Sequence, residues 1–132
     1  MEKLTQRERD CLVAILSVNS EFPIRLSEIA NKLSVRSPTA LNVIKRLSEK
    51  NLIKDKGGMI IVTKEGKKVY KEIIEAHRCF EALLTESGIS LDEACKQVRK
   101  FDYLIDPNTA SKVLSHIGNP KLSKHGRKVI VN

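Results

Sequence analysis

The chain has 132 residues, a net charge of +8 and 41% hydrophobic residues. This length suits one domain, or a small domain with a helical extension that needs a partner. No apolar run approaches the roughly 20 residues that cross a bilayer, and residues 1–7 contain no apolar signal core. Three cysteines in separate segments favour reduced thiols. We therefore expect a cytoplasmic protein with no membrane partner.

The positive charge is unevenly distributed along the chain. Residues 1–63 hold 11 Lys/Arg against 7 Asp/Glu, residues 64–117 hold 9 of each, and residues 118–132 hold four basic residues and no acid. A basic head, a neutral middle and a basic tail are typical of a DNA-reading head on a helical body. Many other soluble proteins are basic, so the charge alone does not identify the partner.

The N-terminal segment predicts a capped helix. Thr5 and Glu8 have the spacing of a capping box, and apolar residues follow at helical spacing to about Ser17. Residues 19–23 have the composition of a loop.

The next segment predicts a helix-turn-helix. Residues 26–33 form a short amphipathic pattern, and residues 34–36 form a turn. Ser37 is a good N-cap for a second helix, with Pro38 at the first helical position, where its missing N–H is not needed. Asn51 is placed to end this helix.

A basic hairpin is predicted directly after the second helix. Residues 52–55 and 60–63 have the composition of strands, and they flank the turn Lys56-Gly57-Gly58. Two helices, a tight turn and a two-stranded wing together make a winged helix-turn-helix, which we assign to residues 1–63.

The remaining chain predicts three helices, each bounded by capping signals, and then a basic tail. The helices cover residues 64–88, 90–105 and 106–118. We expect a mostly α protein, in which the winged helix-turn-helix is followed by a helical dimerisation and effector-binding domain over residues 64–118. Residues 119–132 are expected to be an irregular tail with a short strand at 129–131.

The second helix of the predicted helix-turn-helix carries a DNA-reading face. A helix in the major groove needs donors to base edges near its N-terminus and cations aimed at phosphates. Asn42 can pair bidentately with adenine, and the carbons of Pro38 and Thr39 can pack on thymine methyls. The candidates for base contacts are Arg36, Ser37, Pro38, Thr39 and Asn42, and those for phosphate contacts are Lys45, Arg46, Lys54 and Lys56. The predicted partner is double-stranded DNA. The alternatives are that this polar face is only a solvated helix face, or that the winged helix binds protein.

The long fourth helix predicts a dimer. Ile73, Ile74, Phe80, Leu83 and Leu84 form an apolar stripe that the head cannot cover. Packing on the last two helices and on a second copy would bury it. The two-fold homodimer would also present two recognition helices to a palindromic operator.

Several segments resemble the DtxR/MntR family of metal-dependent repressors, also called the iron-dependent repressor family. They are residues 27–33, 37–47, 52–53 and 61–66, together with His77-Arg78 and Glu93-Ala94-Cys95. The most specific part is the Thr-Lys-Glu-Gly helix start with a histidine some ten residues on, and the resemblance covers residues 4 to about 118. It implies a homodimer that closes onto its operator when a divalent metal, usually Fe(II) or Mn(II), binds where helices one, four and five meet. We expect no SH3-like third domain, which the family often adds.

The resemblance also implies metal ligands on the first and fourth helices. Asp10 matches a position that supplies a primary-site ligand. His77 matches the family's helix-four histidine, and Glu81 lies at i+4, where the ancillary site takes a carboxylate.

The fifth helix departs from the family pattern. Asp102-Tyr103 stands where the family has an acidic residue followed by histidine, Cys95 falls at an ancillary ligand position, and Arg99 replaces a soft or acidic primary ligand. An alternative alignment makes Cys95 a primary ligand, with Val98 and Arg99 in place of the acid and the histidine. Either alignment weakens the standard primary site, because arginine brings a permanent positive charge.

A mixed nitrogen, oxygen and sulfur site is nevertheless predicted. His77 and Glu81 share one helical face, Cys95 and Asp102 share another two turns apart, and Asp10 completes the set. The expected cofactor is a divalent metal, Fe(II), Mn(II) or Zn(II), and a thiolate favours Zn(II) or Fe(II) over Mn(II). In the competing interpretation His77 and Glu81 form a surface hydrogen bond, Cys95 is a core residue, and Asp102 pairs with Arg99.

We therefore predict a sequence-specific transcriptional regulator, a dimeric repressor that responds to a divalent metal. An enzyme is not expected, because the chain has no phosphate-binding glycine loop, no nucleophile–base spacing and only 4% aromatic residues; no small-molecule substrate is expected either. Two alternatives stay open. One is a relative with a degenerate metal site, whose DNA binding is metal-independent or redox-controlled through Cys95 or Cys79. The other is a protein-interaction adaptor.

Overall fold

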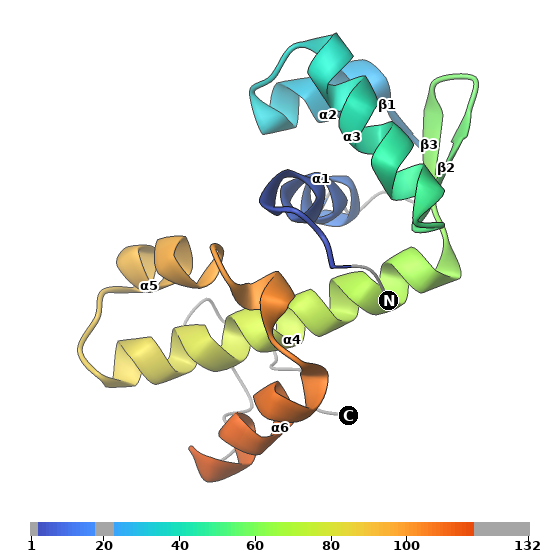
Figure 1. Cartoon of the computed structure of the whole chain (residues 1–132). Coiled ribbons are helices and arrows are strands. Elements are labelled where there is room, and N and C mark those ends of the chain that lie inside the picture. Colours follow the sequence, from blue (N-terminus) through green and yellow to red (C-terminus); the bar gives the residue numbers. More distant parts are fainter. Residues whose placement is uncertain (1–2, 18–22, 118–132) are drawn as a thin grey trace. The chain divides into compact units, whose positions relative to one another are not determined.

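The computed structural model describes residues 3–17 and 23–117, and the chain divides into two compact units, residues 1–70 and 71–132. The division falls inside helix α4 (Lys64–Glu86), which begins in the first unit and ends in the second (Figure 1). None of the helices in the described residues combines the length and the hydropathy that crossing a membrane requires. The domain limits at residues 63 and 118 stay predictions.

Helix α1 (Gln6–Ser17) begins with the capping box that its sequence predicts. The Thr5 amide donates to Glu8 Oε1 at 3.1 Å, and the Glu8 amide donates to Thr5 Oγ1 at 3.2 Å. Both hydrogen bonds satisfy amides that have no partner within the helix. Cys11 and Leu12 are fully buried on the inner face of α1, in the core of the first unit.

Helices α2 (Leu26–Leu33) and α3 (Ser37–Glu49) form the predicted helix-turn-helix. Ser34 closes α2 in the left-handed conformation (φ 55°), and the Val35 amide donates to the Ala30 carbonyl at 3.0 Å. This C-cap reverses the chain within a few residues and fixes the start of α3 relative to α2.

The two ends of α3 differ in how closely they follow the prediction. Asn51 lies just beyond the helix with φ 62°, a left-handed conformation that asparagine tolerates, so its predicted place at the end of α3 is confirmed. Ser37 is not the N-cap. The extended cap conformation belongs to Arg36 (φ −76°, ψ 153°), and no side chain caps the helix. Because Ser37 is already the first helical residue, Pro38 occupies the second position of the first turn.

The predicted hairpin forms from β2 (Ile53–Lys56) and β3 (Met59–Val62), which pair antiparallel. Lys56 pairs with Met59, which leaves Gly57 and Gly58 as a two-residue turn with φ of 63° and 88°. Positive φ at both turn residues is the requirement of a type I′ hairpin, and glycine meets it without strain.

The sheet has a third strand that the sequence did not predict. Strand β1 (Ile24–Arg25) pairs antiparallel with β3, with Ile24 opposite Ile60, and the strand order is β1-β3-β2. The predicted two-stranded wing is confirmed as β2–β3, and β1 extends it to a three-stranded sheet. Two residues are too few to show the alternation that identifies a strand, so only tertiary pairing reveals β1.

The start of α4 explains the Thr-Lys-Glu-Gly sequence. Thr63 Oγ1 accepts a hydrogen bond from the Gly66 amide at 3.0 Å, so Thr63 caps the helix. A Cβ atom on Gly66 would lie 2.1 Å from the Leu52 carbonyl oxygen. Glycine is thus required here because the first turn of α4 packs directly on the backbone that leads into β2.

The second unit contains the rest of α4, α5 (Leu91–Val98), the 3₁₀ turn η1 (Asp102–Leu104) and α6 (Pro107–His116). Ser90 Oγ accepts from the Glu93 amide at 3.3 Å, and Asp106 Oδ1 accepts from the Asn108 amide at 2.8 Å. These caps confirm where the last two helices begin.

Packing between α4 and α6 builds part of the core of this unit. Cys79 and Leu114 are buried against each other, with Phe80, Val113 and Ile117 packed around them. The apolar face of α6 therefore packs against α4.

The predicted helix from residue 90 to 105 is too long. Helix α5 ends at Val98, and the Phe101 amide donates to the Val98 carbonyl at 3.0 Å in a tight turn. The Phe101 ring packs edge-on against Phe80 of α4, with ring centroids 5.4 Å apart. This aromatic contact holds the chain in a course that a continuous helix would not take.

Some predictions fall on residues outside the described part of the chain. These are most of the loop at 19–23, the helix end at Gly118, the basic tail and its strand at 129–131.

Candidate metal centre and nucleic-acid interface

Helix α4 presents a histidine and a glutamate one turn apart. His77 is half-buried, whereas Glu81 is 1% exposed. His77 Nε2 lies 3.2 Å from Glu81 Oε2. The competing interpretation therefore expects the right contact, but it is wrong in placing that contact at the surface, because Glu81 is buried.

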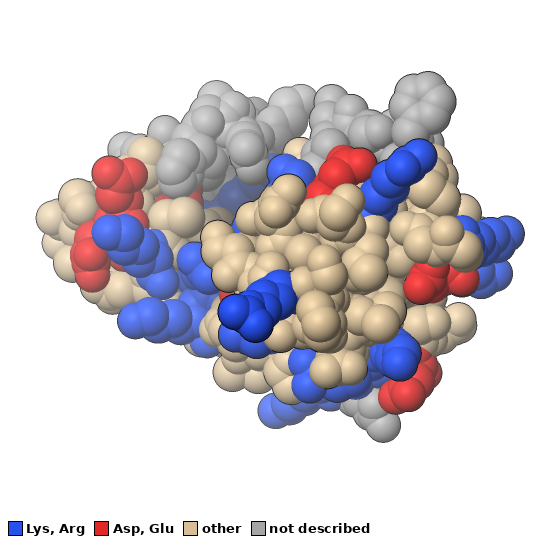
Figure 2. All heavy atoms as spheres, turned by 90° about the horizontal axis from the view of Figure 1, so that it is seen from above, with Lys and Arg blue, Asp and Glu red and all other residues tan. Residues whose placement is uncertain are grey.

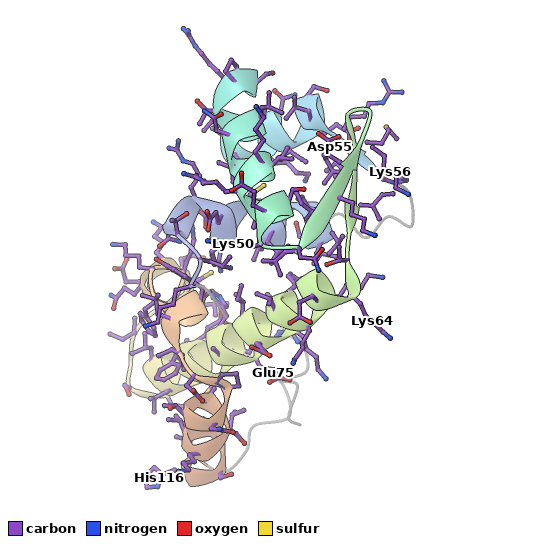
Figure 3. The ribbon with its side chains drawn as sticks, turned by 45° about the vertical axis from the view of Figure 1, so that its right-hand side comes forward. Lys50, Asp55, Lys56, Lys64, Glu75 and His116 are labelled. Atoms are coloured by element: carbon purple, nitrogen blue, oxygen red, sulfur yellow. The ribbon has the colours of Figure 1, made fainter. Side chains whose placement is uncertain are left out.

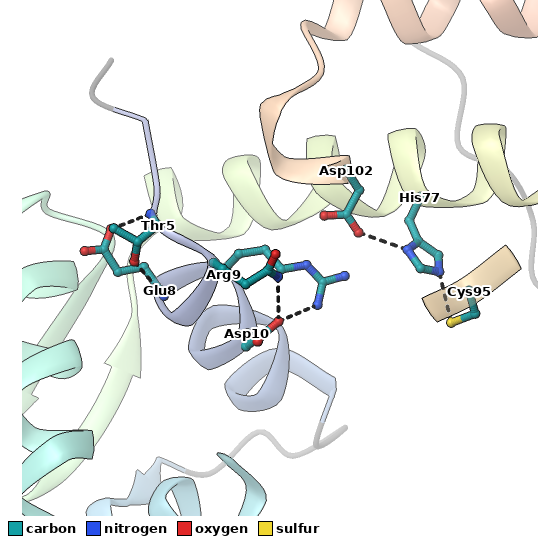
Figure 4. A network of polar contacts seen from close by, with 8 residues as sticks. Thr5, Glu8, Arg9, Asp10, His77, Cys95 and Asp102 are labelled. Atoms are coloured by element: carbon teal, nitrogen blue, oxygen red, sulfur yellow. Dashed lines mark hydrogen bonds and ion pairs between the residues drawn. The ribbon is translucent and has the colours of Figure 1, made fainter. Parts of the chain in front are cut away.

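Helix α5 adds a cysteine to this pair. Cys95 Sγ lies 3.4 Å from the same ring nitrogen, Nε2 of His77 (Figure 4). One nitrogen, oxygen or sulfur atom from each of His77, Glu81 and Cys95 lies within 4.8 Å of the other two. Three potential ligands from two helices thus meet at one point.

Asp102 reaches the opposite side of the histidine ring. Its Oδ2 lies 2.9 Å from His77 Nδ1, and the side chain is fully buried (Figure 4). Because α5 ends at Val98, the prediction that Cys95 and Asp102 share one face of a continuous helix is wrong. The two residues meet His77 at different nitrogens instead.

The donor set fits a borderline divalent cation. Zn(II) binds imidazole nitrogen at about 2.0–2.1 Å and thiolate sulfur at about 2.3 Å, so tetrahedral ligands of these kinds are about 3.5 Å apart. The observed separation of His77 Nε2 from Cys95 Sγ, 3.4 Å, is close to that value. His77, Glu81 and Cys95 would supply one nitrogen, one oxygen and one sulfur ligand, and three protein ligands leave a position open for a further donor.

Comparison with known proteins identifies the family of this chain. Residues 63–130 match the family model described as "Iron dependent repressor, metal binding and dimerisation domain". The chain belongs to the iron-dependent repressor family. Because this family regulates transcription, the predicted resemblance and the prediction that the chain is not an enzyme are both confirmed.

Solved structures show the fold of this chain. A hypothetical protein from Sulfolobus solfataricus is 30% identical over 97% of this chain and 100% of its own, with a TM-score of 0.82. A manganese-dependent transcriptional repressor in complex with manganese is 22% identical, over 92% of this chain and 57% of its own, with a TM-score of 0.78. ScaR with bound Zn²⁺ is also 22% identical, over 92% and 58%, with a TM-score of 0.77. Comparison with curated protein sequences gives no match.

These structures confirm the predicted fold class, a mostly α chain with a winged helix-turn-helix and a helical domain. At identities below 25%, the two repressors support the fold alone. This chain spans less than three-fifths of the length of either one.

Asp10, the ligand predicted on the first helix, lies in the first unit. Its Oδ1 accepts a hydrogen bond from Gln6 Nε2 at 3.3 Å and pairs with Arg9 at 3.1 Å (Figure 4). These contacts hold the carboxylate on its own helix. Its role as a metal ligand stays a prediction.

The other two cysteines are core residues. Cys11 and Cys79 are fully buried. Burial, with smaller contributions from the charges of Asp10 and Glu8, raises the pKa of Cys11 to about 12. Burial raises the pKa of Cys79 to about 11, and its Sγ donates to the Ala110 carbonyl at 3.6 Å. Cys95 is therefore the cysteine best placed for metal or redox chemistry.

The predicted DNA-reading residues lie on the outside of the first unit. On and next to α3, Thr39 is half-buried and the others are exposed: Arg36, Ser37, Pro38, Asn42, Lys45 and Arg46. The first turn of α3 contains no acidic residue, so the positive end of its dipole is not neutralised. Lys54 and Lys56 are exposed on β2.

The hairpin and the charges on the surface also bear on DNA binding. Lys56 and Asp55 lie on the hairpin, where Asp55 Oδ1 accepts from the Gly58 amide at 2.9 Å (Figure 3). On the face drawn in Figure 2, Lys and Arg side chains stand in several separate groups, with Asp and Glu side chains among them. The candidate interface is thus identified by the geometry of α3 rather than by one continuous basic patch.

One functional link was missed by sequence reasoning. Glu8 is 1% exposed, and its carboxylate forms ion pairs with Lys50 and with Arg46, whose Nε lies 3.2 Å from Oε2. Arg46 was assigned only to phosphate, and Glu8 only to capping. The signal was the position of Glu8, which lies on the same helical face as the apolar Cys11 and Leu12, where a charge needs a partner.

Proposed function

We propose that this protein is a dimeric repressor whose binding to an operator depends on a divalent metal held by His77, Glu81 and Cys95. The observation that supports it is the meeting of one potential ligand atom from each residue within 4.8 Å. Such a group is typical of a metal site, because each residue type supplies a lone pair that a divalent cation accepts.

The thiol makes Zn(II) and Fe(II) better candidates than Mn(II). Thiolate is a soft ligand, whereas Mn(II) prefers carboxylates, carbonyls and water. The buried Glu81 carboxylate supplies negative charge to the same point, which lowers the cost of bringing a cation there. When bound, the metal would join α4 to α5, because it would take ligands from both helices.

DNA recognition is assigned to α3 and to the β2–β3 hairpin. Asn42 and the exposed residues around Arg36 at the start of α3 would face base edges, and Lys45, Lys54 and Lys56 would face phosphates. Arg46 would serve two partners, because its Nε pairs with Glu8 while its side chain is 47% exposed.

The dimer is proposed on two grounds. The matching family model is described as a metal-binding and dimerisation domain. A two-fold pair of these chains would present two copies of α3 to the two halves of a palindromic site.

A binding assay with a matched histidine control tests the proposal. The purified protein first selects a duplex from a random pool. Its binding to this labelled duplex is then measured by fluorescence anisotropy in the presence of Zn(II), Fe(II) or Mn(II), and again after addition of chelator. We expect metal-dependent binding that His77→Ala abolishes and that His116→Ala, at an exposed position on α6, leaves intact. DNA binding that is unchanged by chelator and by His77→Ala would support the metal-independent alternative. The absence of DNA binding at low salt would support the protein-interaction adaptor.

A further inference from the structure

The two nitrogens of His77 have different partners. Nδ1 lies 2.9 Å from Asp102 Oδ2, whereas Nε2 lies 3.2 Å from Glu81 and 3.4 Å from Cys95. These nitrogens are on opposite sides of the imidazole ring. A carboxylate that accepts from Nδ1–H therefore does not share the metal that Nε2 would bind.

Burial gives the contact between Asp102 and His77 its strength. The Asp102 side chain is fully buried, so its carboxylate is held away from water, where a charge-assisted hydrogen bond is stronger than at the surface. A metal-binding histidine usually donates its second N–H to a carboxylate or a carbonyl, which fixes the tautomer and the orientation of the ring. Asp102 stands in that relation to His77.

The break after α5 determines this position. The helix ends at Val98, and the ring of Phe101 packs on Phe80 at 5.4 Å. The chain then turns, so that η1 begins at Asp102. Phe80 lies three residues after His77 on α4, so the contact that anchors the turn is adjacent to the histidine that the turn serves.

We propose that Asp102 is a positioning residue for the metal centre and not one of its ligands. It holds His77 with the proton on Nδ1 and turns the lone pair of Nε2 toward Glu81 and Cys95. This inference rests on the proposed metal site. It assigns that site three protein ligands from the second unit, and Asp102 supports them without binding the metal.

The test is a Co(II) and Zn(II) titration of the full-length wild-type protein and three variants. Asp102→Ala removes the acceptor. Asp102→Asn keeps an acceptor oxygen of the same shape without the charge. Asp106→Asn is the matched control, because it makes the same charge change on an exposed residue that caps α6.

We expect Asp102→Ala to weaken binding of both metals by about 10- to 100-fold, the range typical for such supporting carboxylates. Asp102→Asn should lose less, and Asp106→Asn should match the wild type. The thiolate-to-Co(II) charge-transfer band and the ligand-field bands should keep their positions and intensities at saturation in every variant, because the ligands are unchanged. In the Zn(II)-bound wild type, NMR should detect the His77 Nδ1 proton in slow exchange with water, and Asp102→Ala should accelerate that exchange.

Each other outcome overturns one part of the account. Changed ligand-field bands in Asp102→Ala or Asp102→Asn would make Asp102 a ligand, and affinities equal to that of the wild type would show that it does not position His77. Either result would overturn this inference alone. No binding of Co(II) or Zn(II) to the wild type would overturn the proposed metal site as well. If circular dichroism shows that Asp102→Ala does not fold, the comparison of Asp102→Asn with Asp106→Asn decides.

Discussion

The two units of this chain encode their functions at different ranges along the sequence. In the first unit, the capping box, the turn at Ser34 and the Gly57-Gly58 hairpin are each specified by neighbouring residues. In the second unit, the candidate metal centre joins His77 and Glu81 of α4 to Cys95 of α5 and Asp102 of η1. Neighbouring residues thus determine the turns and caps of the first unit, whereas tertiary packing determines the candidate metal centre of the second unit.

This contrast predicts that mutations in the head change its stability and DNA binding, and leave the intrinsic metal affinity of the second unit unchanged. Mutations around His77 should change the metal affinity and the metal dependence of DNA binding, and leave the stability of the first unit unchanged.

Gly66→Ala should be the most destabilising change in the head. Its Cβ would lie 2.1 Å from the Leu52 carbonyl oxygen and 2.8 Å from Val62 Cγ1, so backbone must move. We expect a loss of about 3 kcal/mol, the upper part of the range for overpacking, measured by urea denaturation. Gly57→Ala is the control, because it meets no atom within 4 Å and suffers only from its φ of +63°, a cost of about 1–2 kcal/mol. Equal losses for the two variants would contradict the close approach.

Glu8→Ala should destabilise the head by about 2 kcal/mol, because it removes a cap and leaves Lys50 and Arg46 without their buried partner. Glu49→Ala, at an exposed position on α3, should change the free energy of unfolding by less than about 0.5 kcal/mol. The same denaturation experiment measures both. If Glu8→Ala behaved like Glu49→Ala, the ion pairs would carry no stability.

Asn42→Ala should weaken binding to the selected duplex by about 1–2 kcal/mol and relax the base preference at one position, because it would remove the proposed bidentate base contact. Lys56→Ala should weaken binding to all duplexes alike and reduce its salt dependence, as expected for a phosphate contact. Anisotropy titrations against the selected duplex and single-base variants measure both effects. A uniform loss for Asn42→Ala would remove it from the base-reading set.

The cysteines should respond to pH and to alkylating reagents according to their burial. Cys95 should react in the native protein and be protected by bound metal, whereas Cys11 and Cys79 should react only after unfolding, as mass spectrometry can show.

Burial raises the pKa of Cys11 and Cys79 from 9.0 to about 12 and about 11. The folded state therefore holds both protons more tightly, so their contribution to stability is complete below pH 9 and is lost as the pH rises toward 11–12. Native reaction of Cys11 at neutral pH would contradict this burial.

The sequence predicts the structure correctly where neighbouring residues determine it. Thr5 with Glu8 specified a helix start, Gly57-Gly58 specified a hairpin, and the motif ending in Gly66 specified the junction with α4. Each of these signals lies within a few residues of its effect. The strand β1 failed this condition, because its two residues become a strand only by pairing with β3.

The sequence predicts His77, Glu81 and Cys95 as members of one site, and the three residues meet in the candidate metal centre. Their arrangement could not be predicted from the sequence. The spacing of His77 and Glu81 on one helix placed that pair correctly. The role of Asp102 depended on the end of α5 at Val98, which Phe101 enforces by packing on Phe80. No local signal distinguishes that break from a continuing helix, so Asp102 was assigned as a ligand and not as the partner of Nδ1.

The role of His77 is tested by comparing metal-dependent DNA binding between His77→Ala and His116→Ala. We expect Zn(II) or Fe(II) to promote binding of the wild type and of His116→Ala to the selected duplex. His77→Ala should lose more than about 100-fold in metal affinity, because a lost ligand costs more than a lost supporting residue, and it should not respond to metal. Equal metal-dependent DNA binding by His77→Ala and the wild type would contradict the account.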